Sequence, residues 1–475
     1  MTDPIIDPDL TRHTDDPAAE NDYTELHQNK NFLEELTAVI RSSDPDAVYL
    51  FLKPYNAAEV ADLMEALEPR DRRGLISLLG EKLDPEVLAE IEGSAQDDLY
   101  EQLPNEQIAD AVTEMETDDA VYVLEELDEE DRTEVLKALP SDDRVAIEEI
   151  LNYPEDSAGR MMQRDLVSLP EYWTVGQAID LLRDETADLP DDFYDIFIVS
   201  PLHYPIGKVS VSKIMRSKRE ILLSAIMDVD PPTVNVMADQ EEVAYRFTKY
   251  HLISAAVTDE NNRLVGMVTV DDVVDVIGEE AEEDILALAG VGEQSMGDSV
   301  LSISKDRFKW LSVNMLTAIL ASLVIGFYDG TIEQLVALAV LMPIVASMGG
   351  NAATQTMTVT VRALATKELS PANARRSVFR ELKVATLNGI TLSLVSALVA
   401  YIWFANPLLS AVFAVAMIFN LICAGLCGIL IPLVLDRAGQ DPAIASSVFV
   451  TTITDVVGFF AFLGLATAII PFVSP

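Results

Sequence analysis

An aspartate inside a long apolar segment is the feature that most restricts how this chain can fold. Residues 443–471 can cross a bilayer as a helix rising about 1.5 Å per residue, and Asp455 lies near their middle. A carboxylate there costs about 2.5 to 3.5 kcal/mol to insert, so it must face a partner, water or an ion. The segment has no basic residue, and Thr451, Thr452 and Thr454 add hydroxyl groups. Asp455 is therefore predicted to bind a cation on a permeation path; a hydrogen bond to a neighbouring helix is the alternative.

The apolar segment is the last of several. The sequence predicts five membrane spans, at about 310–328, 333–361, 384–404, 408–435 and 443–471. Lys and Arg precede the first span and occur in the second-to-third and fourth-to-fifth connections, whereas the other two connections have none. The rule that positive residues stay inside predicts a multi-pass protein of the cell (inner) membrane, with a cytosolic N-terminus and an external C-terminus.

The charge is unevenly distributed along the chain. The 475 residues include 79 acids against 32 Lys and Arg, a formal net charge of −47, but residues 301–475 hold only 8 of these acids and 10 of these bases. An acidic soluble part is thus followed by a membrane part. Such an excess repels nucleic acid and attracts cations, so no nucleic-acid partner is expected; adaptation to a salty medium is the alternative explanation.

The cysteines and histidines restrict the kind of cation. Cys423 and Cys427 lie one helical turn apart in an apolar segment, which excludes a structural disulfide framework, and all four histidines lie outside the membrane part. These absences argue against zinc or copper and for a hard cation with oxygen ligands. No nucleophile–base pair or phosphate-binding loop stands out, so an enzyme is not expected.

The N-terminal part divides into a tail and a helical domain. Residues 1–30 are acidic and Pro-rich, which predicts a disordered tail rather than a signal or transit peptide. Residues 31–153 are predicted to form short helices with polar N-caps. Their repeat of 12 residues, typical of a solenoid, is marked by Leu103, Met115, Leu127, Leu139 and Leu151.

Residues 154–277 alternate β-rich segments with amphipathic helices in two similar halves; 161–183 matches 226–247. The residues resemble a tandem pair of CBS modules, which often bind adenine nucleotides. The ribose-contacting pattern of that family corresponds to Gly266, Thr269 and Asp272 in the second half. In the first half Lys213 departs from it. The resemblance implies ATP or another adenine nucleotide at the second module.

Residues 278–309 are predicted to form a largely helical connector. Glu280, Glu283 and Asp284 share one helix face, where like charges repel unless cations lie against them. An exposed acidic helix is the alternative.

The second span contains a polar insertion. Gly349 and Gly350 lack bulk, and a break in the helix there would present free carbonyl groups against protein or water. Packing of small residues against a neighbouring helix is the alternative. Asn420 and Pro432 of the fourth span are expected to serve packing and a kink. The pore-lining candidates are Gly349, Gly350, Asn351, Thr354, Gln355, Thr451 and Thr454.

Two membrane motifs, GGNAATQTMTVTVRALA and QDPAIASSVFVTTITDVVG, follow the CBS pair and the acidic helical domain. In this order they resemble the MgtE family of magnesium channels. The resemblance implies a homodimer whose pore lies between the subunits, lined by the second and fifth spans, with Asp455 facing hydrated Mg²⁺. Ser447 stands where members of the family can carry Asn.

The resemblance also implies that Mg²⁺ bound between the cytosolic domains and the connecting (plug) helix closes the pore. Tyr122 and His251 stand where the family has sensor acids. The matching sensor acids are Glu86, Asp118, Asp239, Glu241, Asp272, Asp275, Glu280, Glu283 and Asp284. We expect these acids to repel one another without Mg²⁺, so that the connector swings and frees the pore.

The expected protein is a multidomain membrane protein: an α-helical N-terminal solenoid, α/β tandem CBS domains, a plug helix, and a five-helix transmembrane domain at 310–475. Its expected function is Mg²⁺ uptake gated by intracellular Mg²⁺. A transporter of Mn²⁺, Co²⁺ or Ca²⁺ is the alternative, and a membrane-anchored nucleotide sensor without transport is a third hypothesis.

Overall fold

A computed structural model describes residues 29–473 except 185, 188, 191–192 and 292–299. The predicted disordered tail thus lies almost entirely outside the described residues. The chain forms two compact units. One comprises Met1–Glu155 and Met162–Leu166, and the other comprises Asp156–Met161 and Val167–Pro475.

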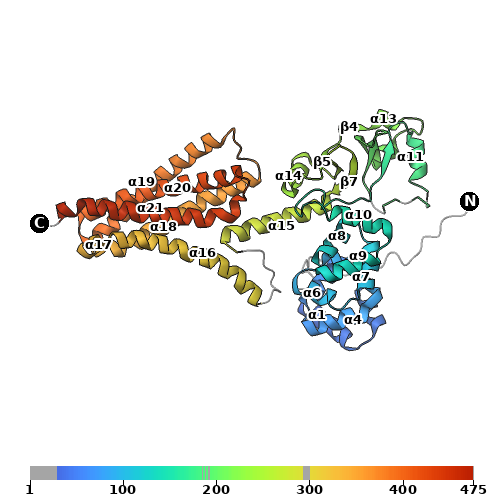
Figure 1. Cartoon of the computed structure of the whole chain (residues 1–475), viewed down its shortest axis with the longest axis horizontal. Helices are drawn as coiled ribbons and strands as arrows, with labels where there is room; N and C mark the ends of the chain where they lie inside the picture. Colours follow the sequence, from blue (N-terminus) through green and yellow to red (C-terminus); the bar gives the residue numbers. More distant parts are fainter. Residues whose placement is uncertain (1–28, 185, 188, 191–192, 292–299, 474–475) are drawn as a thin grey trace, which may run out of the picture. The chain divides into compact units, whose positions relative to one another are not determined.

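The first unit is built from short helices (Figure 1). Its interior is aliphatic, with Leu36, Leu63, Leu75 and Leu99 fully buried. The helices are α1 (Lys30–Arg41), α2 (Pro45–Leu52), α3 (Ala57–Ala66), α4 (Pro69–Leu79), η3 (Gly80–Lys82), α5 (Val87–Glu90), α6 (Gly93–Tyr100), α7 (Asn105–Glu114), α8 (Thr117–Glu126), α9 (Glu129–Ala138) and α10 (Ser141–Ile150).

The 12-residue repeat predicted from the sequence is confirmed, because α7, α8, α9 and α10 begin 12 residues apart. The repeated apolar residues lie just after helices rather than within them; Leu127 and Leu139, for example, are the buried residues that end α8 and α9. The prediction of polar N-caps holds for α1, α2 and α3, which are capped by Asn29, Asp44 and Asn56. It also holds for α9, where the Asp128 carboxylate accepts hydrogen bonds from the Glu130 and Asp131 amides. The residues before α7, α8 and α10 form no such bond.

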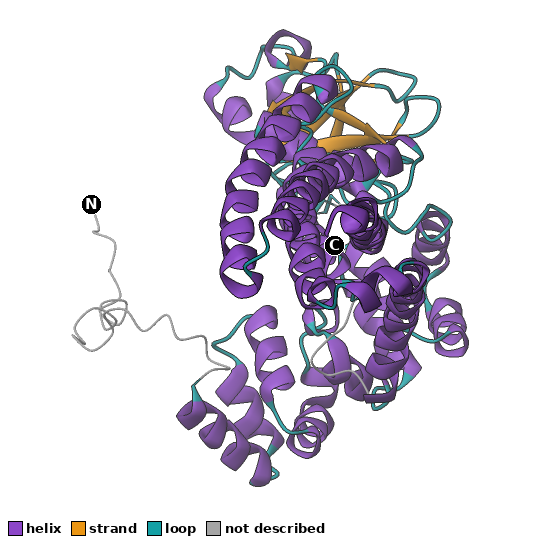
Figure 2. Ribbon diagram, turned by 90° about the vertical axis from the view of Figure 1, so that its left-hand side faces the viewer, coloured by secondary structure: helices purple, strands orange, loops and turns teal. Residues whose placement is uncertain are grey.

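The second unit begins with two small sheets flanked by helices (Figure 2). The first sheet has the order β1-β2-β3-β4 and the second the order β5-β6-β7. The strands are β1 (Ser168–Pro170), β2 (Asp195–Val199), β3 (Pro205–Ser210), β4 (Asp228–Val229), β5 (Thr233–Asn235), β6 (Ser254–Thr258) and β7 (Leu264–Thr269). The helices are α11 (Val175–Leu181), α12 (Val211–Arg216), α13 (Leu223–Ile226) and α14 (Gln240–Tyr250).

The two sheets repeat one pattern, as the sequence predicts for two similar halves. In each, a parallel pair is followed by an antiparallel pair, β1-β2-β3 and β5-β6-β7. Gly207 pairs with Ile198 in the first sheet, and Gly266 pairs with Val257 in the second, each next to a register shift. The α/β character of this region is therefore confirmed.

The connecting helix is continuous with the second half. α15 (Val270–Ala289) begins where the Thr269 hydroxyl donates a 2.6 Å hydrogen bond to Asp272, which also accepts from the Thr269 amide. The sequence analysis predicted that the connector begins at residue 278, which lies inside this helix. α15 ends at Gly290, whose φ of +70° is readily adopted only by a residue without a side chain.

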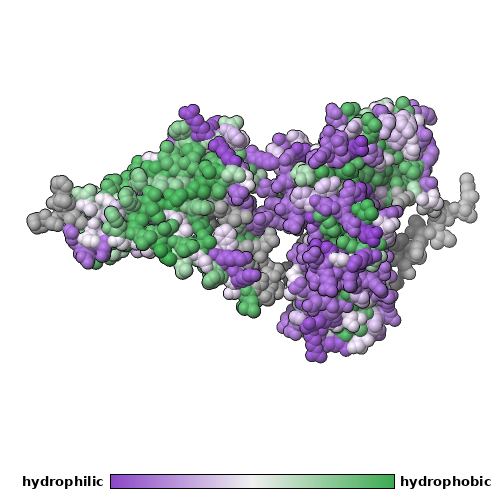
Figure 3. Space-filling view, viewed as in Figure 1, coloured by the Kyte–Doolittle hydropathy of each residue, from purple (hydrophilic) through white to green (hydrophobic). Residues whose placement is uncertain are grey.

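Within the described residues, five helices are long and apolar enough to span a membrane. Apolar side chains cover the outside of this bundle (Figure 3). The third span begins ten residues before its predicted start, and the short α17 was not predicted. The helices are α16 (Val300–Phe327), α17 (Asp329–Gln334), α18 (Ala337–Ala365), α19 (Ala374–Phe404), α20 (Pro407–Arg437) and α21 (Pro442–Val473).

Asn420 of α20 lies at the contact between three helices of the membrane bundle. It is fully buried, and its Nδ2 donates a 2.8 Å hydrogen bond to the Val345 carbonyl of α18. A Cβ at Gly349 would lie 2.3 Å from the Asn420 amide, and one at Gly458 of α21 would lie 2.9 Å from it. Glycine at both positions therefore lets three helices approach one polar side chain, in agreement with the packing role expected for Asn420.

Candidate functional site

Asp455 lies in the middle of α21, on a surface that is only partly covered by the rest of the bundle. Its side chain is half-buried, and among the described residues no charged group lies close enough to act on its carboxyl. No Arg or Lys in the described part of the chain neutralises this carboxylate. An acid in this position must be satisfied by water, a cation or a second polypeptide.

α18, which packs against α21, presents a polar face. Five exposed polar residues recur along this face at helical spacing or beside it: Ser347, Asn351, Thr354, Gln355 and Thr358. The opposite face is buried, through Val345, Gly349, Ala353 and Met357. A hydroxyl and amide stripe on a membrane helix is unfavourable against lipid, so it calls for water or another polypeptide.

The predicted pore-lining residues therefore separate into two sets. Asn351, Thr354 and Gln355 lie on the exposed stripe, whereas Gly349 faces Asn420 in the bundle. Thr454 is fully buried, and its hydroxyl donates to the Thr451 carbonyl at 2.9 Å. The partly buried Thr451 donates its own hydroxyl to the Val448 carbonyl at 3.2 Å.

The suggested break in the second span is wrong. α18 is helical from Ala337 to Ala365, through Gly349 and Gly350. Pro343 is accommodated within it. Backbone carbonyls are therefore engaged in the helix, and the ligands that α18 can offer are side-chain oxygens. The glycine pair has a packing role at Gly349, while the space beside Gly350 is open within 4 Å.

A second group of polar residues surrounds α15, outside the membrane helices. Glu280 accepts a 2.8 Å hydrogen bond from Gln240 of α14. Burial, helped by the nearby charges of Glu241, Asp239 and Asp156, raises the pKa of Glu280 to about 7. The Gln240 hydrogen bond opposes this shift without cancelling it.

The acidic group continues toward the membrane helices. Burial raises the pKa of Glu241, and so do the charges of Asp239, Asp284 and Asp441, whereas Lys367 lowers it. The pKa of Asp284 is raised by burial and by Asp441. Asp441 precedes α21 and accepts a 2.7 Å hydrogen bond from the Ala443 amide. We call Asp239, Glu241, Glu280, Asp284 and Asp441 the acidic cluster.

The sequence analysis predicted four of these five acids and missed Asp441, as it missed the neighbouring Asp156. The position of Asp441, immediately before the fifth span, was the available signal. No group of three or more acidic, His or Cys side chains is close enough to ligate one ion directly, as far as the chain is described. The cluster in this conformation is thus suited to electrostatic or water-mediated attraction of a cation.

The other predicted sensor acids are divided between the two units. Glu86 and Asp118 lie in the first unit, where Glu86 is exposed and Asp118 accepts from the Asp119 amide. Asp275 is exposed on α15, where burial and Asp271 raise its pKa. The remaining predicted acid, Glu283, is a half-buried residue of α15.

The predicted nucleotide-contacting residues already have partners. Thr269 and Asp272 cap α15, and burial raises the pKa of Asp272 although the Thr269 hydrogen bonds oppose the shift. In the first half, Lys213 donates to Asp228 at 2.7 Å. A Cβ at Gly207 would lie 2.6 Å from the sulfur of Met227, so a side chain there would require Met227 to move.

Comparisons with known proteins find three matching families. A family described as a divalent cation transporter, MgtE, matches residues 342–465; the MgtE intracellular N domain matches 55–156; and the CBS domain matches 223–279.

Full-length relatives match as well. The chain is 31% identical over 420 residues to the magnesium transporter MgtE of Bacillus subtilis, covering 88% of this chain and 92% of that protein. It is 33% identical over 323 residues to that of Thermus thermophilus, covering 67% and 71%. Among solved structures, the cytosolic domain of the Mg²⁺ channel MgtE in complex with ATP is 27% identical, with a TM-score of 0.48, over 51% of this chain and 99% of that one.

Proposed function

The chain belongs to the MgtE family, and on that premise we propose that it is a magnesium channel that takes up Mg²⁺ and is closed by intracellular Mg²⁺. The observation that carries this proposal is Asp455, a carboxylate at the centre of a membrane helix with no basic partner among the described residues. Mg²⁺ gives up its water shell reluctantly, so a carboxylate can hold the hydrated ion without stripping it.

The pore is proposed to lie between two copies of the chain. One Asp455 carboxylate offers a single negative charge, and the polar stripe of α18 is open within one subunit. A two-fold axis beside α18 and α21 would bring two carboxylates and two stripes around one aqueous path. The stripe supports this arrangement because it would otherwise face lipid.

Gating is proposed to act through the acidic cluster. Its members lie at the start of α14, on α15 and in the connection before α21, so they link the CBS region to the pore helix. The pKa values of Glu241, Glu280 and Asp284 are raised by lost hydration and by repulsion from neighbouring acids. Mg²⁺ bound among these acids, together with Glu86, Asp118, Asp272, Asp275 and Glu283, would favour the closed arrangement. Such coupling requires that arrangement to bind more ions than the open one.

Uptake in a magnesium-dependent host that lacks its own uptake systems tests the function. The wild type should restore growth at low Mg²⁺, whereas Asp455→Ala and Asp455→Asn should not. Asp329→Asn, which removes an exposed acid of α17 outside the bundle, is the matched control and should restore growth. Growth with both Asp455 variants at the wild-type level, at equal expression, would refute the pore assignment.

The same host distinguishes the ions. Uptake of Mn²⁺, Co²⁺ and Ca²⁺ is measured beside that of Mg²⁺ through the wild type. Preference for one of them over Mg²⁺ at equal concentration would favour the alternative function and overturn Mg²⁺ selectivity. The topology is also part of the proposal, with the basic connections and the N-terminus in the cytosol.

An adenine nucleotide at Gly266, Thr269 and Asp272 is a separate proposal. The ribose hydroxyls would take over the hydrogen-bonding capacity that Thr269 and Asp272 now use with each other. Calorimetric titration of the purified full chain with ATP should give saturable binding that Asp272→Ala weakens. Equal binding by this variant would exclude the second module as the site.

A further inference from the structure

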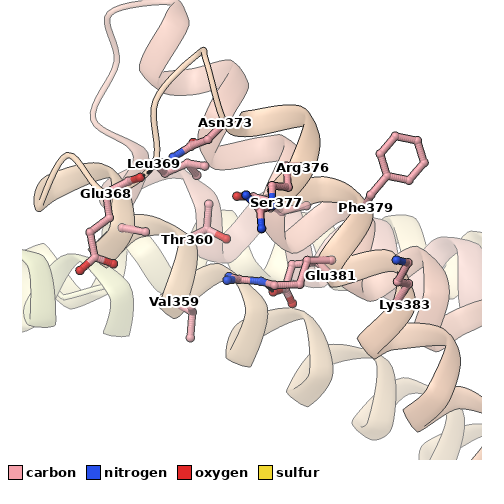
Figure 4. A pocket seen from close by; sticks show the side chains of 13 residues that line it. Val359, Thr360, Glu368, Leu369, Asn373, Arg376, Ser377, Phe379, Glu381 and Lys383 are labelled. Atoms are coloured by element: carbon pink, nitrogen blue, oxygen red, sulfur yellow. Dashed lines mark hydrogen bonds and ion pairs between the residues drawn. The ribbon is translucent and has the colours of Figure 1, made fainter.

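A cavity of about 660 Å³ lies at one end of the membrane bundle, away from Asp455. It is bounded by the end of α18, the start of α19 and Ile429 of α20 (Figure 4). These segments are the C-terminal part of one predicted span and the N-terminal part of the next, so the cavity lies where the bundle leaves the apolar layer. The rest of its lining decides what it can hold.

The cavity has an apolar floor. Leu369, Ala374, Ile429 and Leu433 form a small buried cluster beneath it. Val359 and Phe379, at its edge, are each about half exposed, at 55% and 51%. A ligand that fits here therefore needs an apolar part.

The rim of the cavity is basic. Arg376, Arg380 and Lys383 follow one another at helical spacing along the first three turns of α19, so they share one face. Figure 4 shows Arg376 and Ser377 lying between α19 and Thr360 of α18, whereas Phe379 points away from them. Three cationic groups thus line one wall.

Among the described residues, the acids of the cavity pair with only one of these three cations. Glu381 lies 3.4 Å from Arg380, and Glu368 lies 3.8 Å from Arg362, which is not part of the lining. For Arg376 and Lys383 no acid is found within ion-pair distance in the described parts of the chain. Two cations are thus available to an anionic ligand.

The turn between α18 and α19 gives the cavity a fixed wall. Asn373 donates to the Glu368 carbonyl at 2.7 Å and accepts from the Ser370 amide at 2.9 Å. The Leu369 amide donates to the Ala363 carbonyl at 2.7 Å. These bonds close the turn and hold Glu368 and Leu369 in place beside the basic face.

We propose that this cavity binds the phosphate headgroup of an anionic phospholipid from the leaflet on the side of the basic connections. Arg376 and Lys383 contact the phosphate, and the acyl chains pass over Val359, Phe379 and Ile429. An apolar floor below a basic rim at the membrane boundary matches a phospholipid, since free phosphate or a soluble anion would gain nothing from the floor. The strongly acidic cytosolic part does not oppose this, because the local balance of the cavity is basic.

Native mass spectrometry of the delipidated full chain tests the proposal. The wild type is titrated with phosphatidylglycerol and with phosphatidylcholine of the same acyl chains. Phosphatidylglycerol should bind at least about tenfold more tightly, and 10 mM inorganic phosphate should not displace it. Equal binding of the two lipids overturns the proposal, and displacement by inorganic phosphate shows a soluble-anion site instead.

Variants locate the site. Arg376→Gln with Lys383→Gln should weaken phosphatidylglycerol binding on the order of twentyfold. Arg375→Gln is the matched control, because Arg375 lies outside the cavity with its guanidinium 5.8 Å from the Phe379 ring; it should stay within about twofold of wild type. The charge-conserving pair Arg376→Lys with Lys383→Arg should retain the preference. Unchanged binding by the double Gln variant refutes this location, and the wild-type comparison decides the case if that variant does not fold.

Discussion

Asn420 shows how a single polar side chain can set the spacing of membrane helices. It binds α18 through Val345 and lies against Gly349 and Gly458, so the two glycines are required by its size rather than by backbone conformation. Asp455 lies on the same helix as Gly458, less than one turn away. Packing at Asn420 thus fixes the position of the carboxylate relative to α18.

Substitution of Gly349 by Ala should destabilise the bundle. The new methyl group would lie 2.3 Å from the Asn420 amide, and overpacking of this kind costs about 1–3 kcal/mol. Gly350→Ala is the matched control, because nothing lies within 4 Å of its added carbon. Thermal unfolding of the detergent-purified protein should show a lower Tm for Gly349→Ala and an unchanged or higher Tm for Gly350→Ala. Equal Tm values for the two variants would contradict the packing role.

Much of the site could be predicted at the residue level, since an acid in an apolar helix and the regular spacing of polar residues are visible in the sequence. The buried positions of Gly349 and Thr454 could not be predicted, because a helix has several faces and tertiary packing determines which neighbours each face contacts. Asp441 was missed for a related reason: its partners Glu241 and Asp284 are far away in sequence.

At the scale of single elements, α15 connects the second CBS module to the acidic cluster. Its capping box at Thr269 fixes where the helix starts, and Glu280 and Asp284 follow on it at helical spacing. Ala287, near its end, belongs to a buried cluster with Val450 of α21 and Met357 of α18. Movement of α15 would therefore disturb both predicted pore helices.

The acidic cluster should make stability depend on pH when Mg²⁺ is absent. The pKa of Glu280 rises from 4.5 to about 7 in the folded protein, so the folded state binds this proton more tightly than the unfolded chain. Its contribution to stability is thus present at low pH and is lost as pH rises from about 4.5 through 7. Tm measured with a chelator should fall between pH 5 and pH 8 by less in Glu280→Gln than in the wild type.

The control for this pH effect is Glu282→Gln, which removes an exposed acid of the same helix. It should keep the wild-type pH dependence. Millimolar Mg²⁺ at pH 8 should raise the Tm of the wild type, because a cation can replace the lost protons. An identical pH dependence in wild type and Glu280→Gln would show that this carboxyl does not control the stability of the cluster.

Neutralising the acidic face of α15 should uncouple conduction from cytosolic Mg²⁺. In Glu280→Gln with Glu283→Gln and Asp284→Asn, the repulsion that drives opening and the attraction that drives closure are both removed. Currents recorded in inside-out patches should lose their inhibition by millimolar Mg²⁺, whereas Glu282→Gln should keep it. Inhibition of the triple variant at wild-type concentrations would argue against a sensor on this helix.

The boundaries of elements were less predictable than their existence. The span at 384–404 was placed by hydropathy, but α19 starts at Ala374, because its first three turns carry the basic residues that line the cavity. Hydropathy reports where a helix enters lipid and not where its hydrogen bonds begin. The connector boundary at 278 was placed at the end of the second CBS-like half, but α15 runs across it.

At the scale of the whole molecule, the chain combines an N-terminal part rich in acids with a C-terminal membrane part that is slightly basic. The family, the order of the domains and the five membrane helices could all be predicted from the sequence, since each has its own composition and period. The assembly of two chains around one pore is a proposal that depends on the open polar stripe of α18.

Cross-linking tests the assembly. In a variant whose Cys423 and Cys427 are replaced by Ala, Asn351→Cys should join two chains through a short thiol-reactive cross-linker, because the proposed two-fold axis would place the stripe opposite its copy. A cysteine at Leu394 is the control, since this residue of α19 is 67% exposed on the apolar surface. Cross-linked dimers at Leu394 but not at Asn351 would place the stripe elsewhere.

Mg²⁺ flux into proteoliposomes containing only the purified chain tests the central claim most directly. With a Mg²⁺-sensitive dye inside, the account predicts rapid entry through the wild type and Asp329→Asn, and at least a tenfold slower entry through Asp455→Asn, which keeps the side-chain volume and removes the charge. Flux through Asp455→Asn equal to that of the wild type would contradict the claim that this carboxylate holds the permeating ion.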